Sequence, residues 1–470
     1  MLKYKIINSI NKNKYMNCID EKDKINKRQE ILTKCIDNSY TTRIPSAVIL
    51  GWKSEFFNYK DLIKYKLFNF NFNKKFIPQN STIHFLYKLI NPTTEKGISA
   101  YNKNINKILL MTYRSKYRKQ INIKNKYEYN SDCGWGCMIR SSQMIFARML
   151  YKIFKYIYKN QYNSSAIIIS IIPYFMDDFV SLSDIKESEY IILGLDSYIN
   201  QLKKYLKEKI EKNQYKDFQI KSIDPPFSIH KICTIGELFG RTCGEWFSDF
   251  ELPKIYEIIN TTFNIIPNLS IIHFNSNIEI NTILEKCFER EKEDKNNNKF
   301  KNDCYINNKK EKFKFKKMGA IFVSVRLGVS EISPEYFPSI KRLFECRQFL
   351  GFIGGKVDSA SYFFGYCNDN LLYLDPHVNQ ESEPFLDDKS KNTYMNKTIY
   401  ELNFNSLQCA FTVGFLFRNL FDFTQLLGFF KKFNNDKCPC FHVHFDNETN
   451  NDIDLMENNI KYLDNDKNDF

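Results

Sequence analysis

The sequence predicts an α+β fold with a mainly antiparallel sheet. The first observation is a helical pattern from Cys137 to about Tyr158, where Gly and Pro are absent and apolar residues recur at helical spacing. The second is a later series of short β-rich runs bounded by turn residues. Because the helices precede most of the strands along the chain, the two kinds of element are expected to segregate within one fold.

Further elements follow in chain order. Ile44–Gly51 is apolar and strand-like, whereas Phe72–Asn106 has no clear period. Helical patterns also occur at Leu195–Ile210 and Glu251–Ile259. The predicted strands are Leu269–Phe274, Ala320–Arg326, Tyr362–Cys367, Leu371–Leu374 and Ala410–Phe417. Phe349–Gly355 is too rich in glycine for a plain strand, and its glycines suit a backbone that approaches another group closely.

One large domain is expected between two polar ends. Residues 1–40 predict a basic, flexible N-terminal arm, residues 41–445 the folded domain, and residues 446–470 an acidic, Asn-rich tail. Arg290–Lys317 is of low complexity and almost wholly polar. We interpret it as a surface insertion within the domain and not as a linker between two domains.

The net charge of +14 is unevenly distributed. Residues 1–130 contain 26 Lys and Arg but 9 Asp and Glu, a net charge of +17, which leaves −3 for the remainder. The same stretch is rich in Asn and Ile, so a coding bias accounts for its charge better than a dedicated anion-binding surface. A nucleic-acid-binding protein would bind through this arm in a salt-sensitive manner, but no recognition motif occurs and no nucleic-acid partner is expected.

Cysteine usage and hydropathy predict a soluble, cytoplasmic protein. The 13 cysteines are odd in number and scattered, as in reduced intracellular proteins. The N-terminus has no uninterrupted apolar core of the kind found in a secretory signal. Ala166–Ile172 is too short to cross a bilayer, and Ala410–Phe430 is interrupted by charged residues.

Cys137 is a candidate nucleophile because it follows Gly134-Trp135-Gly136 and falls in the first turn of the predicted helix. The helix dipole and the free amides of that turn stabilise a thiolate and can also receive an oxyanion. Gly136 leaves room for a substrate backbone near the sulfur. The alternative is that Cys137 is a small buried apolar residue at a helix start.

His377 is the candidate base. In an extended backbone Asp375 and His377 point to the same face, so the carboxylate can orient the imidazole. Pro376 between them indicates the end or edge of a strand. The alternative for this tripeptide is a turn capped by the Asp side chain.

The other candidates are weaker. Cys133 lies before the glycines, outside the helix terminus, and a redox disulfide between Cys133 and Cys137 is a minor alternative. Cys438, Cys440, His442 and His444 have the residue types of a metal site, but their spacing fits no ordinary tetrahedral zinc site. His84, His230 and His273 are interpreted as structural, and no metal or cofactor is expected.

Taken together, several ordered motifs resemble the autophagy cysteine proteases, or autophagins. The resemblance extends from about Ile44 to Phe430 and leaves Arg290–Lys317 unmatched. The motifs are Tyr113-Arg114, Asp132 through Met144, Gly244-Glu245-Trp246-Phe247, Val325 through Gly328, Gly354-Gly355-Lys356 with Ser359-Ala360, Tyr373 through His377, and Val413-Gly414-Phe415.

The resemblance implies a papain-like cysteine protease fold and a set of residue roles. Cys137 would be the nucleophile, His377 the base, Asp375 its orienting carboxylate, and Tyr113 the oxyanion-hole residue. Trp246 would cover the glycine-containing tail of the substrate. The remaining substrate-binding candidates are Trp135, Gly136, Gly354, Gly355 and Ser359.

The substrate implied is a ubiquitin-like autophagy modifier, cleaved after its C-terminal glycine. Cleavage would prime the precursor for conjugation or release the modifier from phosphatidylethanolamine, with transient membrane association. The alternatives are a papain-like protease acting on ubiquitin or another ubiquitin-like protein, and a non-catalytic protein that binds the modifier.

Two departures from the family pattern affect the predicted substrate clamp. Val357-Asp358 replaces a usual Pro-Asn, and Ser248-Asp249 replaces a usual Gly-Pro after the Trp-containing motif. The acidic tail contains no convincing motif for binding the modifier.

Overall fold

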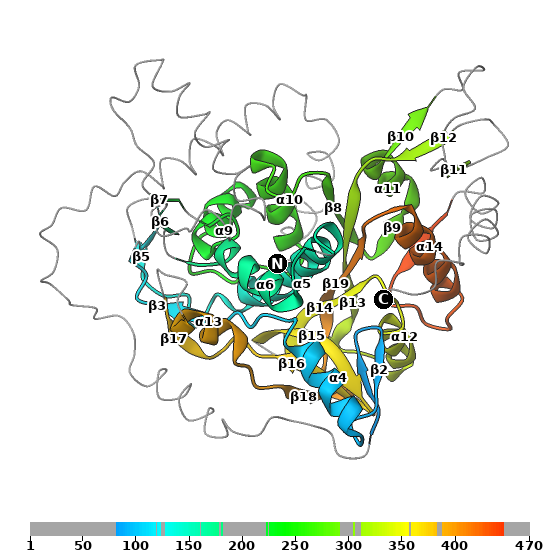
Figure 1. The fold of residues 1–470 in the computed structure, drawn as a ribbon, viewed down its shortest axis with the longest axis horizontal. Helices are drawn as coiled ribbons and strands as arrows, with labels where there is room; N and C mark the ends of the chain where they lie inside the picture. Colours follow the sequence, from blue (N-terminus) through cyan, green and yellow to red (C-terminus); the bar gives the residue numbers. More distant parts are fainter. Residues whose placement is uncertain are drawn as a thin grey trace, which may run out of the picture.

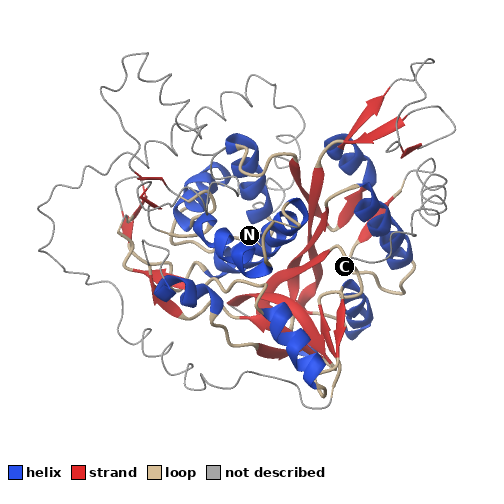
Figure 2. Cartoon of the chain, viewed as in Figure 1, coloured by secondary structure: helices blue, strands red, loops and turns tan. Residues whose placement is uncertain are grey.

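The computed structural model places a twisted sheet between two groups of helices (Figure 1). It describes residues 81–445 except 119, 124–126, 160, 178–179, 182–221, 224, 292–303, 306–311, 357–358 and 383–387. The strand expected at Ile44–Gly51, the helix expected at Leu195–Ile210, the N-terminal arm and the C-terminal tail therefore lie outside the described residues. The helices and the sheet form separate layers, which Figure 2 distinguishes by colour.

Within the described residues the main sheet has nine strands and is almost entirely antiparallel, as predicted. Its principal order is β18 (Tyr400–Asn403), β16 (Asn370–Leu374), β15 (Ser359–Cys367), β14 (Phe349–Lys356), β19 (Gln408–Phe417), β13 (Met318–Glu331) and β8 (Leu269–Asn275). The β8–β13 pair is parallel. The hairpin of β1 (Ile83–Phe85) and β2 (Lys88–Ile90) joins through β15.

Helices cover both faces of this sheet (Figure 1). One group contains α5 (Cys137–Ile157), α6 (Ser164–Ile171), α9 (Ile229–Gly236) and α10 (Leu252–Phe263). The other contains α11 (Ile280–Cys287), α12 (Phe337–Leu343) and α14 (Leu420–Asn434). Helices α4 (Glu95–Ile105) and α13 (Asp388–Met395) lie toward the β16–β18 side. The helices predicted from Cys137 and near Glu251–Ile259 are thus confirmed.

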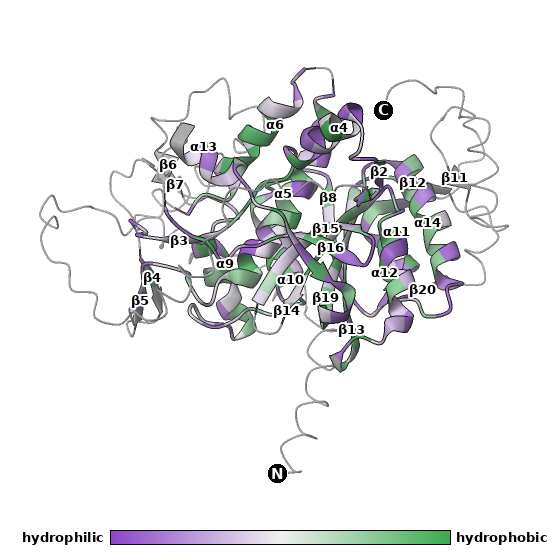
Figure 3. Cartoon of the chain, turned by 90° about the horizontal axis from the view of Figure 1, so that it is seen from below, coloured by the Kyte–Doolittle hydropathy of each residue, from purple (hydrophilic) through white to green (hydrophobic). Residues whose placement is uncertain are grey.

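The core lies where α5 packs on β14 and β15. Phe146 of α5 stacks on Tyr256 of α10 at 3.5 Å between ring centroids and on Phe322 of β13 at 4.8 Å. Figure 3 shows the hydrophobic residues gathered on the central strands and on the helix faces that meet them. Because α5 is fixed along its length by this packing, its first residue, Cys137, has a defined position.

Short pairings complete the fold. They are β3 (Tyr113–Ser115) with β17 (Asn379–Glu381), β4 (Ile121–Ile123) with β5 (Tyr127–Tyr129), β6 (Val180–Ser181) with β7 (Ser222–Ile223), and β9 (Asn277–Glu279) with β20 (His442–His444). Single 3₁₀ turns occur at Ile172–Tyr174, Glu237–Phe239, Pro334–Tyr336 and Phe404–Ser406. None of the helices in the described part of the chain is long and apolar enough to cross a membrane.

The glycine-rich stretch Phe349–Gly355 differs from expectation because it is a strand at the centre of the sheet. Strand β14 accommodates its glycines through a register shift between Phe349 and Gly351, and Gly351 has φ +104°. A Cβ on Gly351 would lie 2.5 Å from the carbonyl oxygen of Phe363 on the next strand. The close approach predicted from these glycines is therefore an approach between strands.

The segment with no clear period, Phe72–Asn106, contains β1, β2 and α4 within its described residues. Helix α4 begins where Thr94 accepts a hydrogen bond from the amide of Gly97 at 3.0 Å. This N-cap is a local signal of the helix start. The hydrophobic pattern did not reveal the helix, because α4 has few apolar residues.

The ends of the predicted insertion are paired as strands. Strand β10 (Phe288–Glu291) pairs with β12 (Lys312–Phe315), and β11 (Cys304–Tyr305) pairs with β12 (Figure 1). The sequence Lys-Phe-Lys-Phe of β12 has the two-residue alternation of a strand, but it is embedded in a polar, low-complexity segment.

Candidate active site

Cys137 lies at the first position of α5, which begins without a side-chain cap. The preceding residue is Gly136, with φ −84° and ψ 0°, and the first turn contains no acidic residue. The sulfur of Cys137 therefore faces the positive end of the helix dipole without a competing carboxylate in that turn. The residue is 7% exposed, so this charge is little screened by water.

Asp375 and His377 follow the end of β16 and lie side by side, as their spacing predicts. Asp375 Oδ1 accepts a hydrogen bond from the backbone amide of His377 at 3.0 Å and also contacts His377 Nδ1. These two contacts fix the orientation of the imidazole, and its Nδ1–H donates to the Asp375 carboxylate. Nε2 is then the nitrogen that remains for chemistry. It is buried, and it interacts with Cys137.

Cys137 and His377 face one another across the junction of helix and sheet and shift each other's pKa. Burial raises the pKa of Cys137, but the hydrogen bond and charge of His377 lower it more, with help from the Ala360 amide and the Tyr113 side chain, so the net direction is down. Burial lowers the pKa of His377, but Asp375 and Cys137 outweigh it and raise it to about 9. Both shifts favour a thiolate–imidazolium pair.

Tyr113 reaches the same point from β3. Its ring lies edge-on to that of His377, at 5.4 Å between centroids and 89° between planes. Its backbone amide donates to the carbonyl oxygen of Pro376 at 2.9 Å, so the residue is tied to the His377 segment. Tyr113, Cys137 and Ala360 form a small buried cluster that Cys133 and Met138 adjoin.

Cys133 lies in the loop before α5, outside the helix terminus, as predicted. Its amide donates to Ser131 Oγ at 3.1 Å, and the residue is half-buried. Cys133 and Cys137 are both free thiols in this structure. The site therefore contains two thiols, of which Cys137 has the helix terminus and the imidazole.

Trp246 lies over the loop that leads to Cys137. It is 53% exposed, and its indole Nε1 donates to the carbonyl oxygen of Gly134 at 2.9 Å. A large exposed aromatic residue beside a nucleophile can cover an extended substrate. The sequence prediction that Trp246 adjoins the substrate path is compatible with this position.

Trp135 has a different environment from Trp246. It is 5% exposed, its Nε1 donates to the carbonyl oxygen of Ser131 at 3.1 Å, and its ring packs edge-on against Tyr129 at 5.8 Å. These contacts hold the loop itself. They leave Trp135 little surface for a substrate, although it stands two residues before Cys137.

The predicted substrate-binding glycines are closely approached by other parts of the chain. A Cβ on Gly136 would lie 2.3 Å from Asp132 Oδ2, and one on Gly354 would lie 2.5 Å from the Cβ of Phe411. On Gly355 it would lie 1.7 Å from the carbonyl oxygen of Ser359, which precedes Ala360, the partner of Gly355 on β15. Gly136 is thus required by the buried Asp132, and the expectation that it also leaves room for a substrate backbone stays a prediction.

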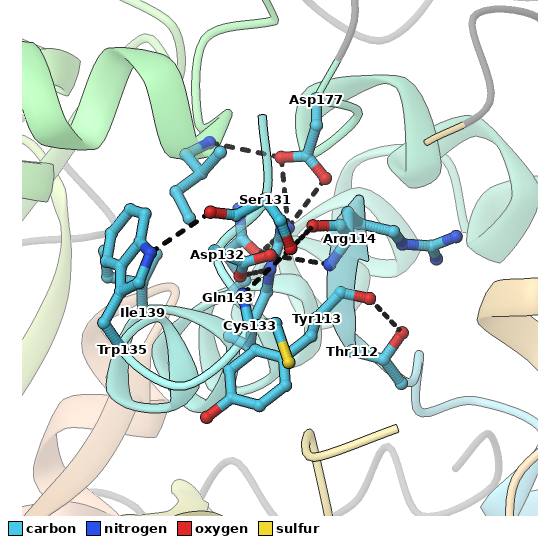
Figure 4. Close-up of polar contacts among 12 residues, drawn as sticks. Thr112, Tyr113, Arg114, Ser131, Asp132, Cys133, Trp135, Ile139, Gln143 and Asp177 are labelled. Atoms are coloured by element: carbon cyan, nitrogen blue, oxygen red, sulfur yellow. Dashed lines mark hydrogen bonds and ion pairs between the residues drawn. The ribbon is translucent and has the colours of Figure 1, made fainter. Parts of the chain in front are cut away.

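Asp132 belongs to the nucleophile motif, but the sequence did not reveal its role in the site. Its side chain is fully buried and accepts hydrogen bonds from the Arg114 amide at 2.6 Å, Tyr117 OH at 2.8 Å and Arg140 Nε at 2.7 Å. Its backbone carbonyl accepts from Gly136 at 2.9 Å. Figure 4 shows Asp132 with Arg114 beside it.

Arg140 extends this network to a second carboxylate. It lies on α5 one turn after Cys137, and its Nη1 donates to Asp177 at 2.8 and 3.0 Å and to Gln143 at 3.1 Å. Burial lowers the pKa of Arg140, but Asp132 and Asp177 raise it well above its ordinary value. The network links β3, the nucleophile loop and α5, so it fixes Tyr113 relative to Cys137. The sequence signal that could have revealed this network is the presence of charged residues within an otherwise apolar helix pattern.

Cys438, Cys440, His442 and His444 have the residue types of a metal site, although their spacing fits no ordinary tetrahedral zinc site. Within the described residues, no group of three or more His, Cys, Asp or Glu side chains is arranged to hold a metal ion. His442 and His444 are exposed at the two ends of β20, and Cys438 Sγ donates to Glu335 at 3.4 Å.

Comparison with known proteins gives one consistent result. Residues 98–428 match the family described as the peptidase C54 catalytic domain. Cysteine protease ATG4D of Xenopus laevis is 25% identical over 329 residues, covering 66% of this chain and 64% of the relative. Cysteine protease ATG4B of Xenopus laevis is 26% identical, covering 67% and 72%, and cysteine protease ATG4A of Bos taurus is 24% identical, covering 69% and 76%. The match therefore spans a little less than two thirds of the first relative's length.

Proposed function

The chain belongs to the peptidase C54 family of cysteine proteases, and from this we propose that it cleaves a ubiquitin-like autophagy modifier after its C-terminal glycine. The α+β fold agrees with the papain-like arrangement of that family. The observation that carries the proposal is the convergence of Cys137 with His377 and its partner Asp375, although Asp375 lies 238 positions after Cys137 in sequence. This supports a working nucleophile over a protein that only binds the modifier.

The first half of the reaction forms an acyl-enzyme. The Cys137 thiolate attacks the carbonyl carbon of the glycine, a carbon–sulfur bond forms, and the carbonyl oxygen takes the negative charge. Tyr113 and the amides at the start of α5 stabilise this oxyanion. As the carbon–nitrogen bond breaks, the His377 imidazolium gives its Nε2 proton to the leaving amine. That amine belongs to the next residue of a precursor or to phosphatidylethanolamine.

The second half regenerates the enzyme. Water attacks the thioester while His377 Nε2 accepts its proton, and the thiolate leaves with the electrons of the carbon–sulfur bond. Asp375 keeps the imidazole in the orientation needed for both transfers. Trp246 and the β14–β15 segment around Gly354, Gly355 and Ser359 would line the narrow path that favours glycine.

A cleavage assay on three substrates tests the proposal. These are an autophagy modifier whose C-terminal glycine is fused to a reporter, the same modifier conjugated to phosphatidylethanolamine in liposomes, and a ubiquitin–reporter fusion. Cleavage of either modifier substrate, with the ubiquitin fusion intact, is the expected result. Cleavage of ubiquitin alone would favour the alternative protease, and binding without cleavage would favour the non-catalytic alternative.

Partners follow from the same proposal. The modifier would be bound both as a soluble precursor and as a lipid conjugate, and the second form requires transient membrane association. Comparing the rates on the two modifier substrates separates priming from deconjugation.

A further inference from the structure

Ser248 and Asp249 occupy the positions after the Trp-containing motif where the resembled family usually carries Gly-Pro. A Gly-Pro pair has no side chain that can form a polar contact, whereas Asp249 has a carboxylate. Asp249 Oδ2 accepts a hydrogen bond from Thr412 Oγ1 at 2.9 Å. Asp249 is three residues after Trp246, so this contact joins the loop that carries Trp246 to the centre of the sheet.

The contact continues through the sheet as a chain of hydrogen bonds. Thr412 Oγ1 lies 2.6 Å from Ser324 Oγ, and Ser324 Oγ lies 2.9 Å from His273 Nε2. The three residues come from adjacent strands β19, β13 and β8, and Ser324 and Thr412 are direct partners in the register. Thr412 is fully buried, so its hydroxyl has no access to water as an alternative partner.

The direction of each bond follows from the number of protons available. Burial raises the pKa of the Asp249 carboxyl above its ordinary value, although the hydrogen bonds that it accepts from Thr412 and from backbone amides lower it. When Asp249 is ionised it can only accept, so Thr412 then donates its single hydroxyl proton to it. Thr412 must then accept from Ser324, and Ser324 must accept from His273. Burial lowers the pKa of His273 to about 3, with Lys254 adding to the effect, so the ring is neutral at physiological pH and carries its proton on Nε2.

The other side of the Trp246 loop is held by packing. Phe247 is buried against α9, where a Cβ on Gly236 would lie 2.5 Å from the Phe247 ring. Glu251 Oε2 accepts from the amide of Ser248 at 3.1 Å and also pairs with Arg241. These contacts fix the ends of the loop, while Asp249 connects it to the strand layer through its side chain.

We propose that Asp249 is a positioning residue that holds Trp246 over the nucleophile loop, and that Ser324 and His273 keep the Thr412 hydroxyl directed at it. The proposal rests on the role of Trp246 as a substrate cover. It explains how a chain without the usual Gly-Pro keeps that residue in place, because a hydrogen bond to a carboxylate replaces the rigidity of a proline.

The test reads the position of Trp246 without requiring activity. Acrylamide quenching is measured for the full chain and for Trp246→Phe, and the difference isolates Trp246 from the other tryptophans. The same pair is then made in Thr412→Val, which keeps the side-chain shape and removes the hydroxyl. Loss of one hydrogen bond to a carboxylate should lower the closed-to-open ratio of the loop roughly tenfold or more, and quenching of Trp246 should rise.

The Ser324→Ala variant tests whether the whole chain of hydrogen bonds positions Trp246 or the contact between Thr412 and Asp249 does so by itself. It touches no residue of the loop, yet it should raise the quenching of Trp246 in the same direction as Thr412→Val. Thr424→Val is the matched control, because Thr424 is a buried threonine whose hydroxyl donates to the Leu420 carbonyl in α14. It should lower thermal stability without changing the quenching of Trp246.

Unchanged Trp246 quenching in Thr412→Val, with a loss of stability like that of Thr424→Val, would overturn the proposal. If Thr412→Val does not fold, Asp249→Ala gives the same test from the loop side. In the peptidase assay the variants should raise KM for a glycine-containing substrate by several-fold with a smaller effect on kcat. If the unaltered chain cleaves no modifier, the proposed function fails, but the quenching result stands separately.

Discussion

The Arg140 guanidinium and the Asp132 carboxylate form an ion pair at 2.7 Å, in which both side chains are at most 1% exposed. The pair brackets Cys137 in sequence and ties the loop before it to the helix after it. Asp177 shares the same guanidinium at 2.8 Å, so one cation pairs with two buried carboxylates.

Replacing Arg140 with Leu should therefore destabilise the fold strongly. The change leaves Asp132 and Asp177 buried without their counter-charge, and removing one partner of a buried pair costs about 3–5 kcal/mol. The free energy of unfolding from urea titration measures the loss. Arg418→Leu is the control, because its pair with Asp422 at 2.6 Å is more accessible to solvent and should cost less. Equal losses of unfolding free energy in the two variants would show that the deeper burial of the Arg140 network does not increase its contribution to stability.

Cys137→Ser should abolish cleavage of the modifier–reporter fusion and leave substrate binding intact. Removing the nucleophile of a catalytic set typically lowers kcat by on the order of a thousandfold or more. Cleavage is followed by gel electrophoresis and binding by titration. Cys133→Ser is the control and should keep most activity, since Cys133 lacks the helix terminus. Substantial cleavage by Cys137→Ser would show that the nucleophile has been misassigned.

The reactivity of Cys137 should persist below the ordinary pKa of a thiol. The pKa of Cys137 is lowered and that of His377 is raised to about 9, so the thiolate–imidazolium pair exists between the two values. As pH falls through the lowered pKa of Cys137, the thiolate is lost. As pH rises through about 9, His377 loses the proton that the leaving amine needs, and peptide cleavage should decline while alkylation continues.

The rate of iodoacetamide alkylation against pH measures this directly. In His377→Ala the burial of Cys137 is no longer opposed by the imidazolium, so the midpoint of alkylation should move to higher pH. A midpoint that does not move would show that His377 contributes nothing to thiolate formation.

Gly136→Ala should destabilise the site although alanine favours helices. The added Cβ would lie 2.3 Å from Asp132 Oδ2 and 2.7 Å from Asp132 Cβ, and both atoms are held in the buried network. Overpacking of this kind costs about 1–3 kcal/mol. Gly240→Ala provides a comparison in open space, where nothing lies within 4 Å and only the φ of +74° opposes the change. A larger loss of activity in Gly240→Ala would argue against the clash as the cause.

Shortening the insertion should leave the fold intact if the cut respects the hairpin. Glu291 of β10 and Lys312 of β12 are paired in the register, so residues 292–311 can be replaced by Asn-Gly as a tight turn. Melting temperature and cleavage rate should change little. Removing all of 290–317 should be more damaging, because Phe315 packs on Phe288 at 5.5 Å and on Phe417 at 6.4 Å. Similar stability of the two deletions would show that β12 contributes nothing to the core.

Strong local patterns made much of the fold predictable. The helix from Cys137 and the strands β8, β13, β15, β16 and β19 have long apolar periods that agree with their tertiary environment. Strand β14 was missed because its glycines are unfavourable locally and are required only by the neighbouring strands. Helix α4 was missed because it is short and few of its residues are apolar, so its buried face, which includes Tyr101 and Ile105, is inconspicuous in the sequence.

The sequence by itself determined the chemistry of the candidate site, because Cys137 at a helix start and the Asp375–His377 spacing are local features. It also determined the α+β class through the order of helical and extended patterns. Only the tertiary structure decided which groups meet. The pairing of Cys137 with His377, the burial of Trp135, the clash that requires Gly136, and the hydrogen bonds from Asp249 to His273 all join residues on different elements. Such contacts depend on how α5 packs on the sheet and on strand register, and neither is encoded in the spacing of any one segment.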